Sequence, residues 1–168
     1  MRTIVFIIVL GMMLSSNAQS IEQLQNEINL QVWKPFKNAF ETLNGKALNA
    51  TYAEQVLRAT PDGIDTQNVF KPKNLERFEQ NKKDGLSIAL DFWFDSRRTN
   101  SDTSYEVGFY RIGFTDKNGN TDFTYGQFHI VLKKIDGQWK ITQDWDTTNI
   151  NGKIIGADDF AAKVPLEF

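Results

Sequence analysis

Apolar side chains recur along this chain with two different periods. Between Ile21 and Leu43 they return every three or four positions, which is typical of an amphipathic helix. From Ile88 onward they alternate with polar residues, which is typical of strands that bury one face. Helices followed by antiparallel strands predict an α+β domain in which the helices cover one face of the sheet.

Local signals divide the first half of the chain into helices and a strand. Ser20 has the properties of an N-cap, and Gln23 stands at capping-box spacing from it. Pro35 should kink or restart the first helix, because it lacks an N–H and its ring clashes with the preceding turn. The other expected elements are two helices and a short strand, over residues 48–54, 73–81 and 56–60.

The second half predicts four strands, over residues 88–95, 105–114, 122–133 and 138–146. Asn118-Gly119 and Asp136-Gly137 are typical of tight hairpin turns. With two-residue loops at both turns, strand alternation places side chains on two faces. The apolar face, which should meet the helices, then holds Phe109, Arg111, Phe128, Gln143 and Trp145, and the polar face holds Glu106, His129 and Asp144. A β-bulge at either turn would shift this pairing by one residue.

Composition excludes several classes of site. The 168 residues are 40% apolar and 24% charged, as in a folded globular domain, and the formal net charge is −2. The chain has no cysteine, so it cannot form a disulfide, a zinc–thiolate site or a thiol nucleophile. His129 is its single histidine. We therefore expect no metal. The chain also has no phosphate-binding loop or nucleotide-binding fingerprint, so we expect no cofactor. The near-neutral charge gives no electrostatic reason for a nucleic-acid partner.

The first eighteen residues have the pattern of an export signal. Arg2 is followed by an apolar run from Ile4 to Leu14, and small residues at Ser16 and Ala18 suit a cleavage site. The run is about half the length that a membrane span needs. We predict cleavage after Ala18, one domain over residues 19–168 without a membrane span, and a periplasmic or secreted location in a bacterium.

Several segments resemble a known superfamily. The stretch Asp136–Asp144 (DGQWKITQD), with Tyr105–Tyr110 and Tyr125–Lys134 before it, resembles SnoaL-like and ketosteroid-isomerase-like proteins of the nuclear transport factor 2-like superfamily. Val32–Phe40 (VWKPFKNAF) looks like the first helix of exported bacterial members. The resemblance implies a cone-shaped roll, with a pocket between three N-terminal helices and a strongly curved antiparallel sheet. It also implies cofactor-free chemistry where a member is an enzyme, and a homodimer through the outer sheet face.

A binding pocket is the main functional hypothesis. An apolar cleft with a few convergent polar groups is the usual form of a ligand site. The predicted ligand-binding residues are Trp33, Phe36, Tyr52, Phe109, Phe128 and Trp145 as aromatic walls, with Arg111 and Gln143 as polar contacts. Because arginine pairs well with planar anions, Arg111 would favour a carboxylate or phenolate on a small apolar or aromatic ligand.

Cofactor-free isomerase or cyclase chemistry is the second hypothesis. The candidate bases are His129, Asp144, Asp91 and Glu106, with Tyr52 or Tyr110 as oxyanion donor. His129 and Asp144 are predicted to face each other across two strands, as a general base and its orienting carboxylate would. The same arrangement suits a surface polar pair worth under about 1 kcal/mol.

A third hypothesis is a protein-interaction module with a vestigial pocket. Relatives often carry a pocket-facing histidine immediately after the position of Asp144, and this chain has Trp145 there. On the predicted register no strand carboxylate lines the pocket. That departure weakens the case for acid–base chemistry and leaves the outer sheet face as a surface for a protein partner.

Overall fold

A computed structural model describes residues 19–168, and the predicted export signal lies outside the described residues. The helical elements are α1 (Ile21–Ile28), η1 (Asn29–Trp33), α2 (Lys34–Glu41), α3 (Gly45–Ala50), α4 (Phe70–Asp84) and α5 (Ala157–Phe160). The strands are β1 (Tyr52–Thr60), β2 (Gly63–Asp65), β3 (Ser87–Thr99), β4 (Thr103–Thr115), β5 (Thr121–Ile135), β6 (Gln138–Thr147), β7 (Asn149–Ile150) and β8 (Lys153–Ile154).

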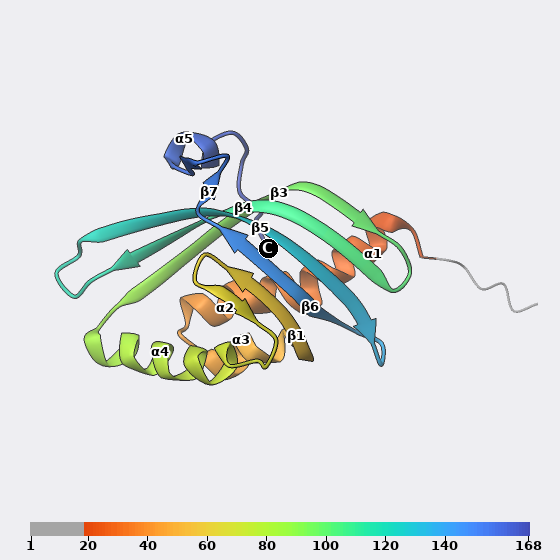
Figure 1. Cartoon of the computed structure of the whole chain (residues 1–168), viewed down its shortest axis with the longest axis horizontal. Helices are drawn as coiled ribbons and strands as arrows, with labels where there is room; N and C mark the ends of the chain where they lie inside the picture. Colours follow the sequence, from red (N-terminus) through yellow and green to blue (C-terminus); the bar gives the residue numbers. More distant parts are fainter. Residues whose placement is uncertain (1–18) are drawn as a thin grey trace, which may run out of the picture.

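Six strands form one curved sheet in the order β2-β1-β6-β5-β4-β3. Helices α1 to α4 lie on one side of this sheet and α5 lies on the other (Figure 1). The predicted α+β class, with helices covering one sheet face, is therefore confirmed. The sheet is mixed rather than wholly antiparallel, because β1 runs parallel to β6.

The first helix begins as the sequence predicts and continues past its proline. Ser20 and Gln23 form the expected capping box. Ahead of Pro35 the helix widens into the π-helical turn η1, in which the N–H of Lys34 donates to the carbonyl of Asn29. The chain thus accommodates Pro35 by widening one turn instead of breaking. The wider turn ends at Trp33, which is buried against the sheet.

The turn between β4 and β5 differs from the predicted two-residue loop. Residues 116–120 connect these strands, and the N–H of Asp116 donates to the carbonyl of Asn120. The Asp116 carboxylate accepts from the N–H groups of Asn118 and Asn120, and Gly119 takes a positive φ of 86°. This longer turn shifts the register of β4 against β5 by one residue.

A bulge in β6 shifts a second register. The two-residue turn at Asp136-Gly137 is confirmed, since Ile135 pairs with Gln138. Leu132 still pairs with Ile141, but Val131 pairs with Gln143, so Thr142 is an extra residue on β6. Because side chains alternate along a strand, every later residue of β6 changes face.

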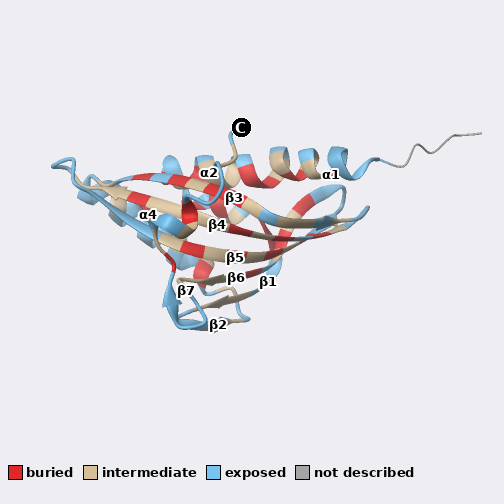
Figure 2. Cartoon of the chain, turned by 90° about the horizontal axis from the view of Figure 1, so that it is seen from above, coloured by how far each residue is buried: buried red, intermediate tan, exposed pale blue. Residues whose placement is uncertain are grey.

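Aromatic side chains fill the space between the long first helix and the sheet. The ring of Trp33 lies 5.3 Å from Phe92, 5.3 Å from Phe94 and 5.4 Å from Phe128, between ring centroids. A Cβ on Gly108 would lie 2.4 Å from the Phe128 ring, so only glycine permits this close approach. Figure 2 shows the buried residues along this helix and the middle of the long strands.

The C-terminal segment, which the sequence did not predict, covers part of the outer sheet face. The indole N–H of Trp93 donates to the carbonyl of Phe160 in α5 over 2.8 Å. Beyond α5, the N–H of Leu166 donates to the carbonyl of Phe92 over 2.8 Å, at the free edge of β3. This segment therefore shields both a face and an edge that could otherwise pair with another chain.

Candidate functional site

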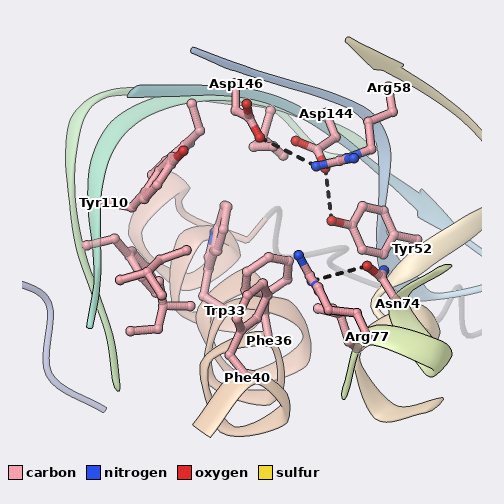
Figure 3. A pocket seen from close by; sticks show the side chains of 16 residues that line it. Trp33, Phe36, Phe40, Tyr52, Arg58, Asn74, Arg77, Tyr110, Asp144 and Asp146 are labelled. Atoms are coloured by element: carbon pink, nitrogen blue, oxygen red, sulfur yellow. Dashed lines mark hydrogen bonds and ion pairs between the residues drawn. The ribbon is translucent and has the colours of Figure 1, made fainter. Parts of the chain in front are cut away.

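A cavity of about 210 Å³ lies between the helices and the concave face of the sheet (Figure 3). The turn η1 and helices α2, α3 and α4 supply one wall, and strands β1, β3, β4, β5 and β6 supply the rest. The lining residues are Trp33, Phe36, Phe40, Leu48, Tyr52, Arg58, Asn74, Arg77, Leu90, Phe92, Tyr110, Ile112, Phe128, Ile130, Asp144 and Asp146. Most of these side chains are apolar, and the charged ones are two arginines and two aspartates.

Helix α2 supplies the aromatic wall of the cavity. Phe36 and Phe40 are four residues apart, so helical periodicity places them on one face. Their ring centroids lie 5.1 Å apart, and Phe36 lies 5.9 Å from Trp33. These packed rings present an apolar aromatic surface, which suits an apolar or aromatic ligand.

The polar end of the cavity is a hydrogen-bonded group on β1 and β6. The Tyr52 hydroxyl donates to Asp144 over 2.9 Å, and Arg58 Nε donates to the same carboxylate oxygen over 3.2 Å. Arg58 Nη2 also reaches Asp146 over 3.5 Å. The parallel pairing of β1 with β6 places Arg58 directly beside Asp144. One arginine therefore faces two carboxylates.

Asp146 is the least satisfied of these groups. Burial, and then the negative charge of Asp144, raise the pKa of Asp146 to about 6, while Arg58 acts in the opposite direction. Its side chain is 22% exposed, and the 3.5 Å contact to Arg58 is its one hydrogen bond within residues 19–168. A carboxyl group with this pKa can take up or release a proton near neutral pH.

Both cavity tyrosines keep their protons at ordinary pH. Burial and the negative charge of Asp144 raise the pKa of Tyr52 well above its usual value. Burial and the charges of Asp146 and Asp144 likewise raise the pKa of Tyr110. The two hydroxyl groups are therefore hydrogen-bond donors inside the cavity and not bases.

Four of the predicted binding residues line this cavity, namely Trp33, Phe36, Tyr52 and Phe128. They come from helix α2 and its preceding turn, from β1, and from β5 ahead of the bulge. Their placement agrees with the sequence analysis, and their role in binding stays a prediction.

The other four predicted binding residues do not line the cavity. The one-residue shift of β4 turns Phe109 and Arg111 to the outer face, where Phe109 stacks on Trp93 at 4.6 Å. Arg111 there pairs with Asp91 over 2.6 Å. The bulge at Thr142 likewise exposes Gln143 and Trp145 on the outer face. The predicted placement of these four residues was wrong because the turn between β4 and β5 is longer than two residues and because β6 contains a bulge.

The predicted pair of His129 with Asp144 does not form. His129 pairs across strands with Trp145, whose ring lies edge-on at 4.5 Å, and its Nδ1 lies 2.5 Å from the Tyr105 hydroxyl. Asp144 lies on the opposite face and lines the cavity. The pair was predicted from a register that the bulge in β6 changes.

The two remaining candidate bases are held in ion pairs. Asp91 contacts Lys37 over 3.3 Å in addition to Arg111, and Arg111 and Lys37 lower its pKa against the effect of burial. Glu106 does face the helices, but it is fully buried and is not among the cavity-lining residues. It accepts hydrogen bonds from Trp33 over 2.6 Å and from Arg97 over 2.8 Å.

The sequence analysis missed six cavity residues that carry polar groups or an aromatic ring in this site: Phe40, Arg58, Asn74, Arg77, Phe92 and Asp146. Helical spacing from Phe36 could have identified Phe40. Asp144 and Asp146 are two residues apart on one strand, so their side chains lie on the same face, and the position of one predicts that of the other. Arg58 depended on the parallel pairing of β1, for which the sequence carries no signal.

The shift of β4 also removes part of the argument for a dimer. The predicted register, which turns Phe109 and Arg111 inward, would turn Tyr110 and Ile112 outward as apolar groups for a dimer face, but both line the cavity. The homodimer therefore stays a prediction. Within residues 19–168 no three acidic or histidine side chains group as metal ligands would, and no helix is long and apolar enough to cross a membrane.

Comparison with known proteins identifies the fold. No protein-family model and no curated protein sequence matches the chain. Similar solved structures include a nuclear transport factor 2-like superfamily protein from Salmonella enterica, with 12% identity, 79% of this chain and 99% of that chain covered, and a TM-score of 0.59. A ketosteroid isomerase-like protein from Erwinia carotovora has 16% identity, covers 73% and 96%, and has a TM-score of 0.51.

A third similar structure is a scytalone dehydratase-like protein from Novosphingobium aromaticivorans. It has 14% identity, covers 76% of this chain and 85% of that chain, and has a TM-score of 0.62. These likenesses show that the chain has the cone-shaped nuclear transport factor 2-like fold, as the resemblance in the sequence predicted. At such low identity they do not assign a reaction.

Proposed function

We propose that this chain is a small-molecule-binding domain whose cavity takes a compact, mostly apolar or aromatic ligand. The observation that carries this proposal is the aromatic wall around Phe36 opposite the polar groups of Tyr52, Asp144 and Asp146. A void that results from core packing alone should have an apolar lining, because burying polar groups costs free energy unless they have partners. A ligand with one apolar body and one hydrogen-bonding group would satisfy both sides of the cavity.

A cavity-filling substitution tests this proposal. Ile112→Phe adds a ring inside the cavity, and Val107→Phe adds the same kind of ring on the outer face of the same strand. Aromatic fragments that bind the native protein, detected by calorimetry and by the fluorescence of its tryptophans, should bind Ile112→Phe at least about tenfold more weakly. Val107→Phe should bind them normally. Equal binding by all three proteins would contradict a ligand site in this cavity.

Cofactor-free acid–base catalysis is a second candidate function, favoured specifically by the Asp146 carboxyl group with its pKa of about 6. A base removes a proton efficiently when its pKa lies near the working pH. The hydroxyl groups of Tyr52 and Tyr110 could donate hydrogen bonds to an oxyanion that develops beside it. Two of the similar structures are named after an isomerase and a dehydratase.

Deuterium exchange would test this second function. A panel of enolisable cyclic ketones is incubated with the protein in heavy water, and exchange at the α-carbon is followed by NMR. The rate should rise as the pH increases through about 6, because a base must be unprotonated, and Asp146→Asn should abolish it. Exchange that persists in Asp146→Asn would assign any activity to another group.

We also propose that residues 1–18 direct export from a bacterial cell. The basic start, apolar run and small residues of the sequence support this. N-terminal sequencing of the protein from a periplasmic or medium fraction should begin at Gln19. Recovery of the full chain from the cytoplasm alone would contradict it.

A further inference from the structure

We propose that Arg77 is the anion-binding residue of this cavity, and that the ligand is an aromatic or apolar carboxylate. This inference rests on the proposed binding function and adds the charge of the ligand and the residue that recognises it. It moves the cationic contact from Arg111, which the sequence favoured, to a residue on α4.

Within residues 19–168, Arg77 differs from the other cavity arginine in having no carboxylate partner. Arg58 faces Asp144 and Asp146, at 3.2 and 3.5 Å. None of the ion pairs formed within residues 19–168 includes Arg77. Its one hydrogen bond in this part of the chain goes from Nη2 to Asn74 Oδ1 over 3.2 Å. A guanidinium group has five N–H donors, so most of them remain available to a ligand.

The surroundings of Arg77 hold its side chain in place while they remove water from it. Its guanidinium carbon lies 5.0 Å from the centroid of Phe78 and 5.7 Å from that of Phe40. Asn74, which accepts its hydrogen bond, is itself fixed by donating to Asn49 over 3.0 Å. Figure 3 shows the Arg77 side chain directed into the cavity below Tyr52. The residue as a whole stays exposed, which places it at the mouth.

Partial dehydration makes an anionic partner favourable at this position. Burial lowers the pKa of Arg77, and the nearby positive charge of Arg58 lowers it further. Burial deprives the charged form of interactions with water, Arg58 repels it, and no ion pair within residues 19–168 compensates for either effect. A bound carboxylate would supply an opposite charge through short, paired hydrogen bonds, which the planar guanidinium group favours.

The charges inside the cavity fix the orientation of such a ligand. At the polar end two carboxylates already face Arg58, so a third one, on the ligand, would be repelled by them. The ligand carboxylate therefore belongs at Arg77, and its ring belongs against Phe36 and Trp33. An uncharged polar group at the far end of the ligand would meet Tyr110, which lies across the cavity from Arg77 in Figure 3.

Matched pairs of ligands test the charge directly. The probes are benzoate, 2-naphthoate and biphenyl-4-carboxylate, each compared with its neutral primary amide by calorimetry at low salt. We expect at least one carboxylate to bind about tenfold more tightly than its amide, since each factor of ten equals about 1.4 kcal/mol. Arg77→Met, which keeps an apolar stem, should abolish this preference without weakening the binding of the amide. Arg111→Met on the outer face is the matched control and should bind like the native protein.

The outcomes separate this inference from the function on which it rests. Equal affinity of every carboxylate and its amide in the native protein would overturn the anion site and leave the binding function intact. A carboxylate preference that survives in Arg77→Met would also overturn it. If none of the six compounds binds the native protein, both the aromatic ligand and its anionic group are contradicted. An unchanged unfolding midpoint in denaturant would show that Arg77→Met remains folded.

Discussion

Two carboxylate groups on the same sheet face, Glu106 and Asp146, have opposite surroundings. Glu106 is 0% exposed and accepts from Trp33, Arg97 and Ser104, all within 3.0 Å. Asp146 has the 3.5 Å contact to Arg58 and borders the cavity.

The difference between these two residues shows how to recognise a candidate site. A buried carboxylate whose hydrogen bonds are complete contributes to the folded structure and has nothing left for a ligand. A carboxylate with incomplete partners beside a cavity keeps the capacity to bind a ligand or a proton. We therefore expect changes at Glu106 to alter stability, and changes at Asp146 to alter binding and pH dependence.

The largest expected effect is that of Glu106→Ala. This change leaves the largely buried guanidinium of Arg97 without its carboxylate and the indole N–H of Trp33 without its acceptor. Removing one partner of a buried ion pair costs about 3–5 kcal/mol in the free energy of unfolding. Urea denaturation measures it, with Asp95→Ala at an exposed ion pair as the control. A loss below about 1 kcal/mol would show that Glu106 is not structural.

Trp33→Phe should have the next largest effect on stability. The phenyl ring keeps most of the apolar contact, but Glu106 loses its 2.6 Å hydrogen bond. A hydrogen bond to a charged group contributes about 1.5–3 kcal/mol. Combining Trp33→Phe with Glu106→Gln in a double-mutant cycle isolates this bond. Strictly additive effects would mean that the two side chains do not depend on each other.

Asp146→Asn should make the protein more stable at neutral pH. The folded-state pKa of about 6 exceeds the ordinary value of 3.8. The stability that comes from the protonated Asp146 is therefore complete below about pH 4 and is lost as the pH rises through 6. A shift of about two pKa units corresponds to about 3 kcal/mol, which solvent screening of the partly exposed side chain reduces to about 1–2 kcal/mol, and the variant should avoid this loss. Urea unfolding between pH 4 and 8 measures it, with Asp122→Asn as an exposed control; parallel curves for the native protein and Asp146→Asn would contradict the prediction.

A smaller effect concerns pH and ligand charge together. Protonating Asp146 removes a negative charge from a cavity that also contains Asp144, Arg58 and the Tyr110 hydroxyl. The negative charge of Asp62, outside the cavity, also favours the protonated form of Asp146. Binding of 2-naphthoate should therefore strengthen about threefold between pH 7.5 and 5.5, a modest effect because solvent screens the charges. The matched amide should show no such trend, and neither should Asp146→Asn. A trend of equal size for the amide would point to a change of structure.

The smallest expected effect is that of His129→Ala. This histidine lies on the outer face beside Tyr105 and Trp145, away from the cavity. Its removal should leave ligand affinity and any ketone exchange unchanged, and stability within about 0.5 kcal/mol. Loss of exchange in this variant would return His129 to the candidate catalytic residues and contradict the register.

Local sequence signals were enough for the long first helix, the four long strands and part of the site, but not for the helix expected over residues 48–54, where β1 begins at Tyr52. The capping box at Ser20, the Asp136-Gly137 turn and the aromatic face of the first helix all depend on neighbours within a few residues. Trp33 and Phe36 could be placed for that reason. Phe128 could be placed because it lies on a regular strand with a clear apolar alternation.

The rest of the site depended on two single-residue events. The longer turn before β5 and the bulge at Thr142 each move a strand by one position. A one-residue shift exchanges the two faces of a strand, so Arg111 and Trp145 moved outward while Tyr110 and Asp146 moved inward. Apolar and polar residues alternate with the same period in either register, so this pattern could not distinguish the two registers.

The sequence by itself determined an α+β chain with a helical first half, long paired strands and an aromatic helix face, because these follow from local periodicity and turn chemistry. Only the tertiary structure decided which carboxylates and which arginines meet at the cavity. Arg58 reaches Asp144 through a parallel pairing of strands far apart in the chain, and Arg77 reaches the mouth through the packing of α4. Contacts of this kind depend on register and on long-range packing, which no local pattern encodes.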